Sequence, residues 1–307
     1  MSSVALAGNV PSAAALRARS EGRTAWLLAA PAIVLLLLFV LLPVAAVIFL
    51  GFTDFELGYG KFRFVGFENY AHLLNDRTFR RSLWNTSVYT AIVAPVSILL
   101  GLGVALLIEG EGRARGFFRT VYFLPVASLI VAMATVWQYI FHPTIGPLNA
   151  LLSLVGIPGP NWLGASNTVL YSLSIIGIWQ SVGFNMVLFL AGLTAIPREL
   201  YAAAHVDGAK SALDRFFLVT WPMLGPTTLF VVTISITNAV KVFETVKMLT
   251  DGGPNKASEV LLFTIYQEGF VYLRVGYASA MTVVFLAILV VLMLLQYRVL
   301  DRRVHYT

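Results

Sequence analysis

The chain has 307 residues, of which 58% are hydrophobic and only 12% are charged, and its mean hydropathy is +0.82. Soluble domains are roughly half apolar and a quarter charged, so this composition indicates a polytopic membrane protein. The chain has no cysteine and four widely spaced histidines, which excludes disulfides and thiolate metal sites and predicts no metal centre.

Six apolar blocks are each long enough to cross about 30 Å of hydrocarbon. The predicted membrane spans are 26–50, 84–108, 121–141, 169–194, 224–247 and 276–297. Together they form one transmembrane domain, residues 23–307, after a loose cytoplasmic tail, residues 1–22, that is rich in Ala and Ser. The first apolar block is too long for the core of a signal peptide, so we expect an uncleaved span.

The net charge of +6 arises from short cationic clusters beside the apolar blocks. This placement fits membrane topology better than a nucleic-acid partner, which we do not expect. The clusters lie in the two terminal segments and in every second linker, which six spans place on the same side of the membrane. Loop 142–168 on the opposite side has neither Lys nor Arg. The positive-inside rule therefore predicts that both termini are cytoplasmic, although the opposite side also carries cations. The four clusters are Arg17, Arg19 and Arg23; Arg113, Arg115 and Arg119; Arg198, Lys210 and Arg215; and Arg298, Arg302 and Arg303.

A segment before the second span, residues 67–86, has apolar positions at helical spacing. It predicts a short interfacial helix that leads into that span.

Polar residues within apolar blocks are costly in a membrane and are therefore candidates for a functional role. In the fifth block, Asn238, Lys241, Glu244 and Lys247 recur every three residues, so Lys241–Glu244 and Glu244–Lys247 can pair along one helix face. Two interpretations remain open. Either the lysines reach the outer interface while Glu244 neutralises them, or Asn238, Lys241 and Glu244 line a solute path.

The fourth block offers Trp179, Gln180, Ser181 and Asn185. The third offers Trp137, Gln138 and Tyr139 near its outer end. Aromatic faces and amides suit a sugar, so the pathway candidates are Trp179, Gln180, Asn185, Asn238, Lys241 and Glu244. The alternative for the aromatic and amide residues is interfacial anchoring and hydrogen bonding between helices.

The linker between the fourth and fifth spans has the features of two helices joined by a turn. Pro197 and Glu199 favour a helix start, and Asp207-Gly208 is a turn signal because Gly tolerates positive φ. A second helix is predicted over 209–221. These features fit an ordinary re-entry loop as well as a docking surface, and the linker has too few cations for a DNA-binding helix-turn-helix.

Sequence signatures of catalysis are absent. No G-x-x-x-x-G-K-[ST] motif occurs, and the nearest segment, GGPNKAS at 252–258, lacks the Gly-Lys pair. ATP hydrolysis, if transport is active, therefore needs a partner chain. There is also no G-x-S-x-G elbow, and the carboxylates after Asp207 are too few for a membrane alcohol-phosphatidyltransferase, so we do not expect an enzyme.

The same linker, IPRELYAAAHVDGAKSALDRFFLVTWPMLGP at 196–226, resembles the EAA loop of ABC-importer permeases. Two alanines and the Asp-Gly-Ala turn match the family pattern. The family's Glu falls on Ala202, and Glu199, almost one turn earlier, is the candidate substitute. The coupling loop implied by the resemblance comprises Glu199, Ala202, Ala203, Ala204, Asp207, Gly208 and Ala209.

The resemblance covers nearly the whole chain. Within the family it is strongest to the carbohydrate-uptake group and to the first permease of glycerol-3-phosphate importers. The further segments that carry it are FVGFENY (64–70), FETVKMLTDGGP (243–254), YQEGF (266–270) and the basic C-terminus (298–307).

This resemblance implies an all-α integral membrane protein with the type I ABC importer permease fold, six transmembrane helices and a cytoplasmic coupling helix. It implies a bacterial inner-membrane subunit that moves a carbohydrate or a sugar or glycerol phosphate. The expected partners are membrane lipid, a second permease that is a different chain, two ATPase subunits that hold ATP and Mg, and an extracytoplasmic solute-binding protein. No cofactor is expected in this chain. Closure of the ATPases would push on residues 198–209 and rock the spans.

Two other classes of function remain as alternatives. A secondary carrier or channel for a small polar solute would need no ATPase, and a purely structural membrane subunit would lose no transport when its pocket is changed.

Overall fold

The computed structural model describes residues 13–60, 62–110 and 114–301, with side chains described for 25–60, 62–110 and 114–298. The regular elements in these ranges are helices, and one isolated β-bridge joins Thr53 to Phe64. In chain order they are α1 Ala13–Leu36, η1 Leu37–Leu41, α2 Leu42–Leu50, α3 Glu68–Asn75, α4 Arg77–Gly110, α5 Arg115–Ala127, α6 Ile130–Ile140, α7 Pro147–Leu154, α8 Val169–Thr194, α9 Arg198–Val206, α10 Ala212–Arg215, η2 Phe216–Thr220, α11 Trp221–Met223, α12 Gly225–Val240, α13 Glu244–Leu249, α14 Leu261–Tyr266, η3 Gln267–Val271 and α15 Val275–Asp301.

Five of these segments are long and apolar enough to cross a membrane, and the bent pair α5–α6 makes up to six. They cover the six predicted apolar blocks. The five segments other than this pair are 25–50, 77–110, 169–194, 225–249 and 275–298.

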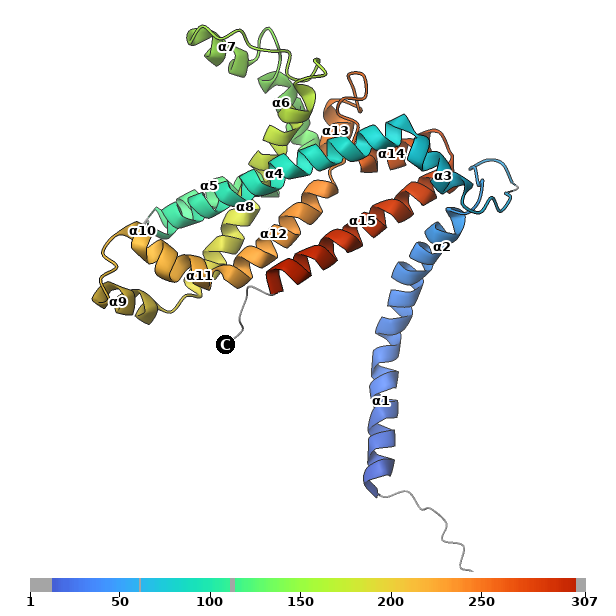
Figure 1. Cartoon of the computed structure of the whole chain (residues 1–307), viewed down its shortest axis with the longest axis horizontal. Coiled ribbons are helices and arrows are strands. Elements are labelled where there is room, and N and C mark those ends of the chain that lie inside the picture. The colour runs from blue at the N-terminus through green and yellow to red at the C-terminus, as the bar shows by residue number, and fades with distance from the viewer. Residues whose placement is uncertain (1–12, 61, 111–113, 302–307) are drawn as a thin grey trace, which may run out of the picture.

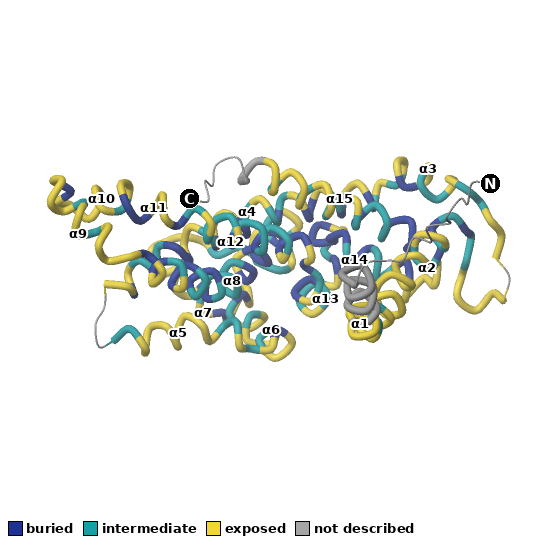
Figure 2. The backbone as a smooth tube through the Cα atoms, turned by 90° about the horizontal axis from the view of Figure 1, so that it is seen from below, coloured by how far each residue is buried: buried dark blue, intermediate teal, exposed yellow. Residues whose placement is uncertain are grey.

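Helices α4, α8 and α12 form the centre of the bundle, and α15 lies along α12 on the side away from α8 (Figure 1). Apolar residues from the three central helices, such as Ala105, Met186 and Val231, are completely buried together. Close approach of α4 to α8 depends on Gly101, because a Cβ there would lie 2.7 Å from the Cβ of Asn185. Figure 2 shows the buried backbone concentrated in this central group.

The continuous helix α1–η1–α2 leaves the bundle at one end and extends away from it (Figure 1). Only the end of α2 packs against α15, and none of the apolar window within 25–50 is buried. The prediction of a loose tail over 1–22 is wrong for residues 13–22, which are helical. Residues 1–12 lie outside the described part of the chain.

The third span is broken, whereas the sequence predicted one helix over 121–141. Helices α5 and α6 meet at an angle of 99°. Ser128 and Leu129 adopt extended backbone, with ψ of 139° and 120°. Pro125 contributes to the break because it has no N–H to donate within the helix, and the Ser128 hydroxyl donates to the Pro125 carbonyl at 2.7 Å.

The fifth span is also interrupted, so the predicted ladder of four polar residues on one helix face is wrong. Helix α12 ends at Val240, and α13 begins only at Glu244. The break lets Phe243 pack against Tyr266, with ring centroids 5.3 Å apart. Neither predicted ion pair of Glu244 is present: Lys247 binds Asp251 at 2.7 Å instead, and the helix break separates Lys241 from Glu244.

The predicted interfacial helix over 67–86 is shorter than expected. Helix α3 ends at Asn75, and the rest of the segment belongs to α4. Asp76 separates the two, since its backbone is extended with ψ of 116° and its carboxylate accepts from the Thr78 N–H at 2.7 Å.

Candidate functional site

The turn after α9 is a Schellman motif. The N–H of Ala209 bonds to the Ala204 carbonyl at 2.9 Å, and the N–H of Gly208 bonds to the His205 carbonyl at 3.2 Å. This pattern requires positive φ at the residue after the helix cap, and Gly208 has φ of +99°. The Asp-Gly-Ala triplet is therefore a rigid helix stop, in which Ala209 is buried and faces back toward the helix.

Helix α9 has two different faces. Tyr201 and Ala204 pack on the buried cluster formed by α4, α8 and η2. Ala202 and Ala203 are exposed on the other side, and Val206 is 85% exposed. The helix thus presents small side chains outward at one end of the molecule (Figures 1 and 2), which suits close approach of another surface.

Ala202 stands where the family pattern has an acid, and a carboxylate lies near it on the same helix. Glu199 is exposed, and it precedes Ala202 by three residues on α9. Residues three apart on a helix are surface neighbours. Glu199 therefore places a carboxylate beside the position where the family has one.

The second helix of the linker begins later than predicted. Instead of running from Ala209, α10 starts at Ala212. Ser211 and Asp214 form a reciprocal capping box with bonds of 3.0 and 3.1 Å, and hydrogen bonds from Ser211, led by the one involving its side chain, lower the pKa of Asp214. The S-x-x-D pattern that signals this start is readable in the sequence.

A polar cavity of about 470 Å³ lies among α4, α5, α8, α12 and α13. Five of the six predicted pathway residues line it: Gln180, Asn185, Asn238, Lys241 and Glu244. The sixth, Trp179, does not line it and instead packs edge-on against Trp137 at 5.4 Å. Ser181, named with Gln180 in the fourth block, lines it as well. Two further polar residues on its wall, Ser235 and Thr245, were not identified from the sequence; Ser235 could have been found as a neighbour of Asn238 on the same helix face.

Asn185 holds the three central helices together. Its amide nitrogen donates to Ser97 on α4 at 3.1 Å, and its amide oxygen accepts from Ser235 on α12 at 2.9 Å. The side chain is 1% exposed. These are hydrogen bonds between helices, which was the alternative to solute contact predicted from the sequence. The side chain also forms part of the cavity wall.

The break between α12 and α13 brings opposite charges to the cavity. Lys241 follows the last turn of α12 and Glu244 opens α13, and both are exposed. Within the described residues, neither belongs to an ion pair. Their charged ends remain available to a solute.

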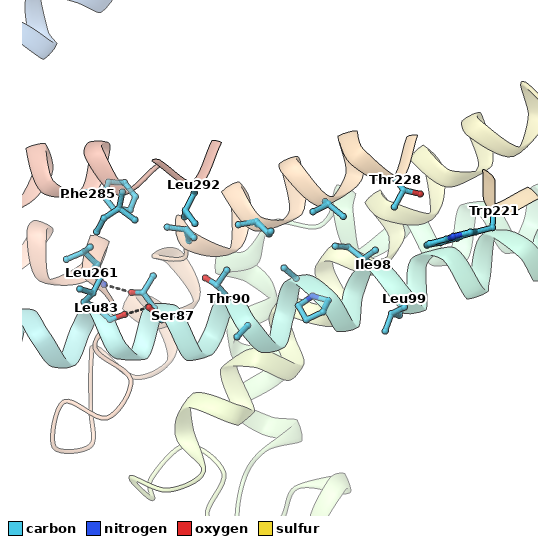
Figure 3. Close-up of a pocket in the computed structure, with 18 residues that line it drawn as sticks. Leu83, Ser87, Thr90, Ile98, Leu99, Trp221, Thr228, Leu261, Phe285 and Leu292 are labelled. Carbon is cyan, nitrogen blue, oxygen red and sulfur yellow. Dashed lines mark hydrogen bonds between the residues drawn. The ribbon is translucent and has the colours of Figure 1, made fainter. Parts of the chain in front are cut away.

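A second hollow, of about 740 Å³, lies between α4, α12 and α15. Its labelled lining is mostly aliphatic and aromatic, with Ser87, Thr90 and Thr228 as the polar exceptions (Figure 3). It offers few hydrogen bonds to a hydrophilic solute, so the smaller polar cavity is the candidate path.

Comparison with known families explains this combination of a bundle, an outward-facing short helix and a polar cavity. The family described as "Binding-protein-dependent transport system inner membrane component" matches residues 97–306. The chain belongs to this family. It is therefore a permease, the multi-pass inner-membrane component of a binding-protein-dependent transporter.

Relatives of the permease have consistent descriptions. It is 32% identical over 283 residues to the sn-glycerol-3-phosphate transport system permease protein UgpA of Agrobacterium fabrum, covering 92% of this chain and 96% of that one. It is 36% identical over 275 residues to the probable ABC transporter permease protein YurN of Bacillus subtilis, covering 88% and 94%. The sulfoquinovosyl glycerol transport system permease protein SmoG of Agrobacterium fabrum is 34% identical over 263 residues, with 85% of each chain covered.

Solved structures show the same fold. A chain of a bacterial alginate ABC transporter, crystallised with an alginate pentasaccharide-bound periplasmic protein, superposes with a TM-score of 0.80 at 23% identity, covering 92% of this permease and 96% of that chain. The MetNI methionine ABC transporter matches with a TM-score of 0.57 at 16% identity, covering 78% and 99%. The predicted type I importer permease fold is thus confirmed.

Proposed function

We propose that the permease is one of two membrane subunits of an ATP-driven importer, and that a carbohydrate or a sugar or glycerol phosphate passes through the polar cavity. The single observation that carries this proposal is the composition of that cavity. Amides and hydroxyls converge there with one ammonium and one carboxylate. Its 470 Å³ falls within the range of about 300–1,000 Å³ usual for small-molecule sites.

The chemistry of the wall fits this class of cargo. Gln180 and Asn238 can both donate to and accept from the hydroxyls of a polyol. Lys241 can attract a phosphate, and Glu244 can accept hydrogen bonds from hydroxyls. The relatives named for glycerol 3-phosphate and for sulfoquinovosyl glycerol support a polyol that carries an anionic group.

ATP and Mg are assigned to partner ATPase subunits, because the sequence has no phosphate-binding loop of the Walker type. The exposed face of α9 is the surface assigned to them, with the set Glu199, Ala202, Ala203, Ala204, Asp207, Gly208 and Ala209 as the coupling loop. The α9 end of the bundle is then cytoplasmic. Both termini are assigned to that side of the membrane.

We assign a second permease, which is a different chain, to the apolar surface exposed between the α1–α2 helix and the bundle. This helix extends from the bundle, and none of its apolar window is buried (Figure 1). An extracytoplasmic solute-binding protein is assigned to the opposite face from α9, and membrane lipid to the remaining apolar surface.

The test is uptake of radiolabelled glycerol 3-phosphate and of its uncharged parent polyol by the reconstituted complex. Removing a hydrogen bond to a charged group costs about 1.5–3 kcal/mol, so Lys241→Gln should raise the KM for the phosphate by roughly 10- to 150-fold. Uptake of the uncharged polyol should change much less.

Lys247→Gln is the matched control, because Lys247 binds Asp251 and does not line the cavity. Equal losses in the two variants, or an unchanged KM in Lys241→Gln for every cargo that the complex carries, would refute the assignment of the path.

A further inference from the structure

Helix α9 makes one polar contact with the bundle through a side chain that the structure describes. The Tyr201 hydroxyl lies 3.0 Å from the Thr220 hydroxyl, within hydrogen-bonding distance. The two residues are 19 positions apart in sequence. Tyr201 is on the half-buried face of α9, and Thr220 is 5% exposed.

Thr220 occupies a special place in the chain. It is the last residue of the π-helical segment η2, and its carbonyl accepts from the Leu224 N–H at 2.9 Å, just before α12. Its hydroxyl also lies 3.4 Å from the Arg215 carbonyl, five residues earlier. The wider turn of a π-helix, which often marks functional sites, thus directs this hydroxyl toward α9.

The contact forms a relay of three groups. If Thr220 donates to the Arg215 carbonyl, the Tyr201 hydroxyl donates to Thr220, and each bond polarises the next. Removing one of the two hydroxyls costs more at a buried site, because the other hydroxyl then loses a hydrogen-bond partner that water does not replace.

The relay connects the two halves of the functional site. On one side is α9, whose exposed residues include Glu199, Ala202, Ala203 and Val206. On the other is the segment that leads into α12, and α12 carries the cavity residues Ser235 and Asn238. Tyr201 and Ala204 also make apolar contacts with the buried cluster, and such contacts allow sliding more readily than a directional hydrogen bond does.

We propose that the Tyr201–Thr220 hydrogen bond is the positioning contact that keeps α9 in register with α12, so that a displacement of α9 reaches the cavity. Both are positioning residues, since neither lines the polar cavity. The inference rests on the proposed function, because it assumes that an ATPase acts on α9.

The experiment uses the complete transporter in proteoliposomes and measures cargo taken up per ATP hydrolysed. Tyr201→Phe removes one oxygen, and Thr220→Val replaces the hydroxyl with a methyl group. Each should lower the ratio of uptake to hydrolysis about three- to tenfold, as expected for one lost hydrogen bond, while ATP hydrolysis and assembly persist. Thr220→Ser keeps the hydroxyl and should retain the wild-type ratio.

Thr233→Val is the matched control, because Thr233 is on the same helix α12 and bonds only to its own helix at the Leu229 carbonyl, 2.9 Å away. It should keep the wild-type ratio. The double variant with Tyr201→Phe and Thr220→Val should be no worse than either single change, since the two remove one interaction.

The possible failures are distinguishable. A wild-type complex without ATP-driven uptake overturns the proposed function and this inference together. A transporting wild-type complex whose Tyr201→Phe variant keeps the normal ratio overturns only the positioning contact, as does a strictly additive double variant or an equal loss in Thr233→Val.

Discussion

Replacing Gly208 tests the coupling turn at a single torsion angle. Its φ is +99°, and a Cβ built on it meets no atom within 4 Å. Any penalty for a side chain there is therefore backbone strain rather than a steric clash. For L-residues, left-handed backbone costs about 1–2 kcal/mol, and a β-branched side chain is further restricted.

Coupling efficiency is expected to decrease in the order Gly, Asn, Ala, Val at position 208, because Asn enters positive φ more readily than other side chains. A cost of 1–2 kcal/mol reduces the population of an ordered state by a factor of about 5–30. Gly208→Val should therefore lower ATP-driven uptake by at least about 5- to 30-fold, while insertion into the membrane stays normal because the turn lies outside the spans.

The assay compares membrane content, basal ATP hydrolysis and ATP-driven uptake across this series. Gly116→Val serves as the control, because Gly116 is on α5, has no positive φ, and has open space around its Cβ position. Wild-type uptake in Gly208→Val would refute the reasoning, and so would an Asn variant that is as impaired as the Val variant.

Three other changes have defined expectations. Ala202→Glu restores an acid beside Glu199 and should be tolerated or mildly strengthen coupling; complete loss of uptake would count against docking at this face. Asn185→Leu removes two interhelical hydrogen bonds and should destabilise the purified complex by about 1–3 kcal/mol, visible as a lower melting temperature; an unchanged melting temperature would contradict the clamp. Burial tends to raise the pKa of Asp76, but hydrogen bonds from the Tyr277 hydroxyl and the Thr78 N–H outweigh it and leave that pKa below its ordinary value. Asp76→Asn should therefore reduce stability at neutral pH. The deficit should shrink as the pH falls below about 4, the ordinary pKa of an Asp in the unfolded chain, toward the lower pKa of Asp76 in the folded protein; a deficit independent of pH would exclude this electrostatic contribution.

The long apolar blocks made the spans predictable, because hydropathy is a local property of the sequence. The breaks were not predictable in the same way. Phe243 leaves the helical path in order to pack on Tyr266, and α5 turns into α6 at Ser128, where the helix direction changes by 99°. Both depend on contacts or backbone conformations that composition does not encode.

The site was predictable where a residue type has few alternative uses. Asp207-Gly208 indicated the turn, and polar residues within apolar blocks identified five members of the cavity wall. Trp179 could not be separated from them by sequence alone, since an aromatic near a span end suits either packing or a sugar. The role of Asn185 as a clamp between helices needed the positions of Ser97 and Ser235, which come from different spans.

Uptake by proteoliposomes that contain the permease with its second permease and ATPase subunits tests the central claim most directly. Binding protein with labelled cargo is supplied on one side and ATP with Mg on the α9 side. The account predicts uptake that requires ATP, the ATPase and the binding protein together. Equal uptake in vesicles that lack the ATPase, or uptake that is insensitive to ATP and follows an ion gradient, would contradict it.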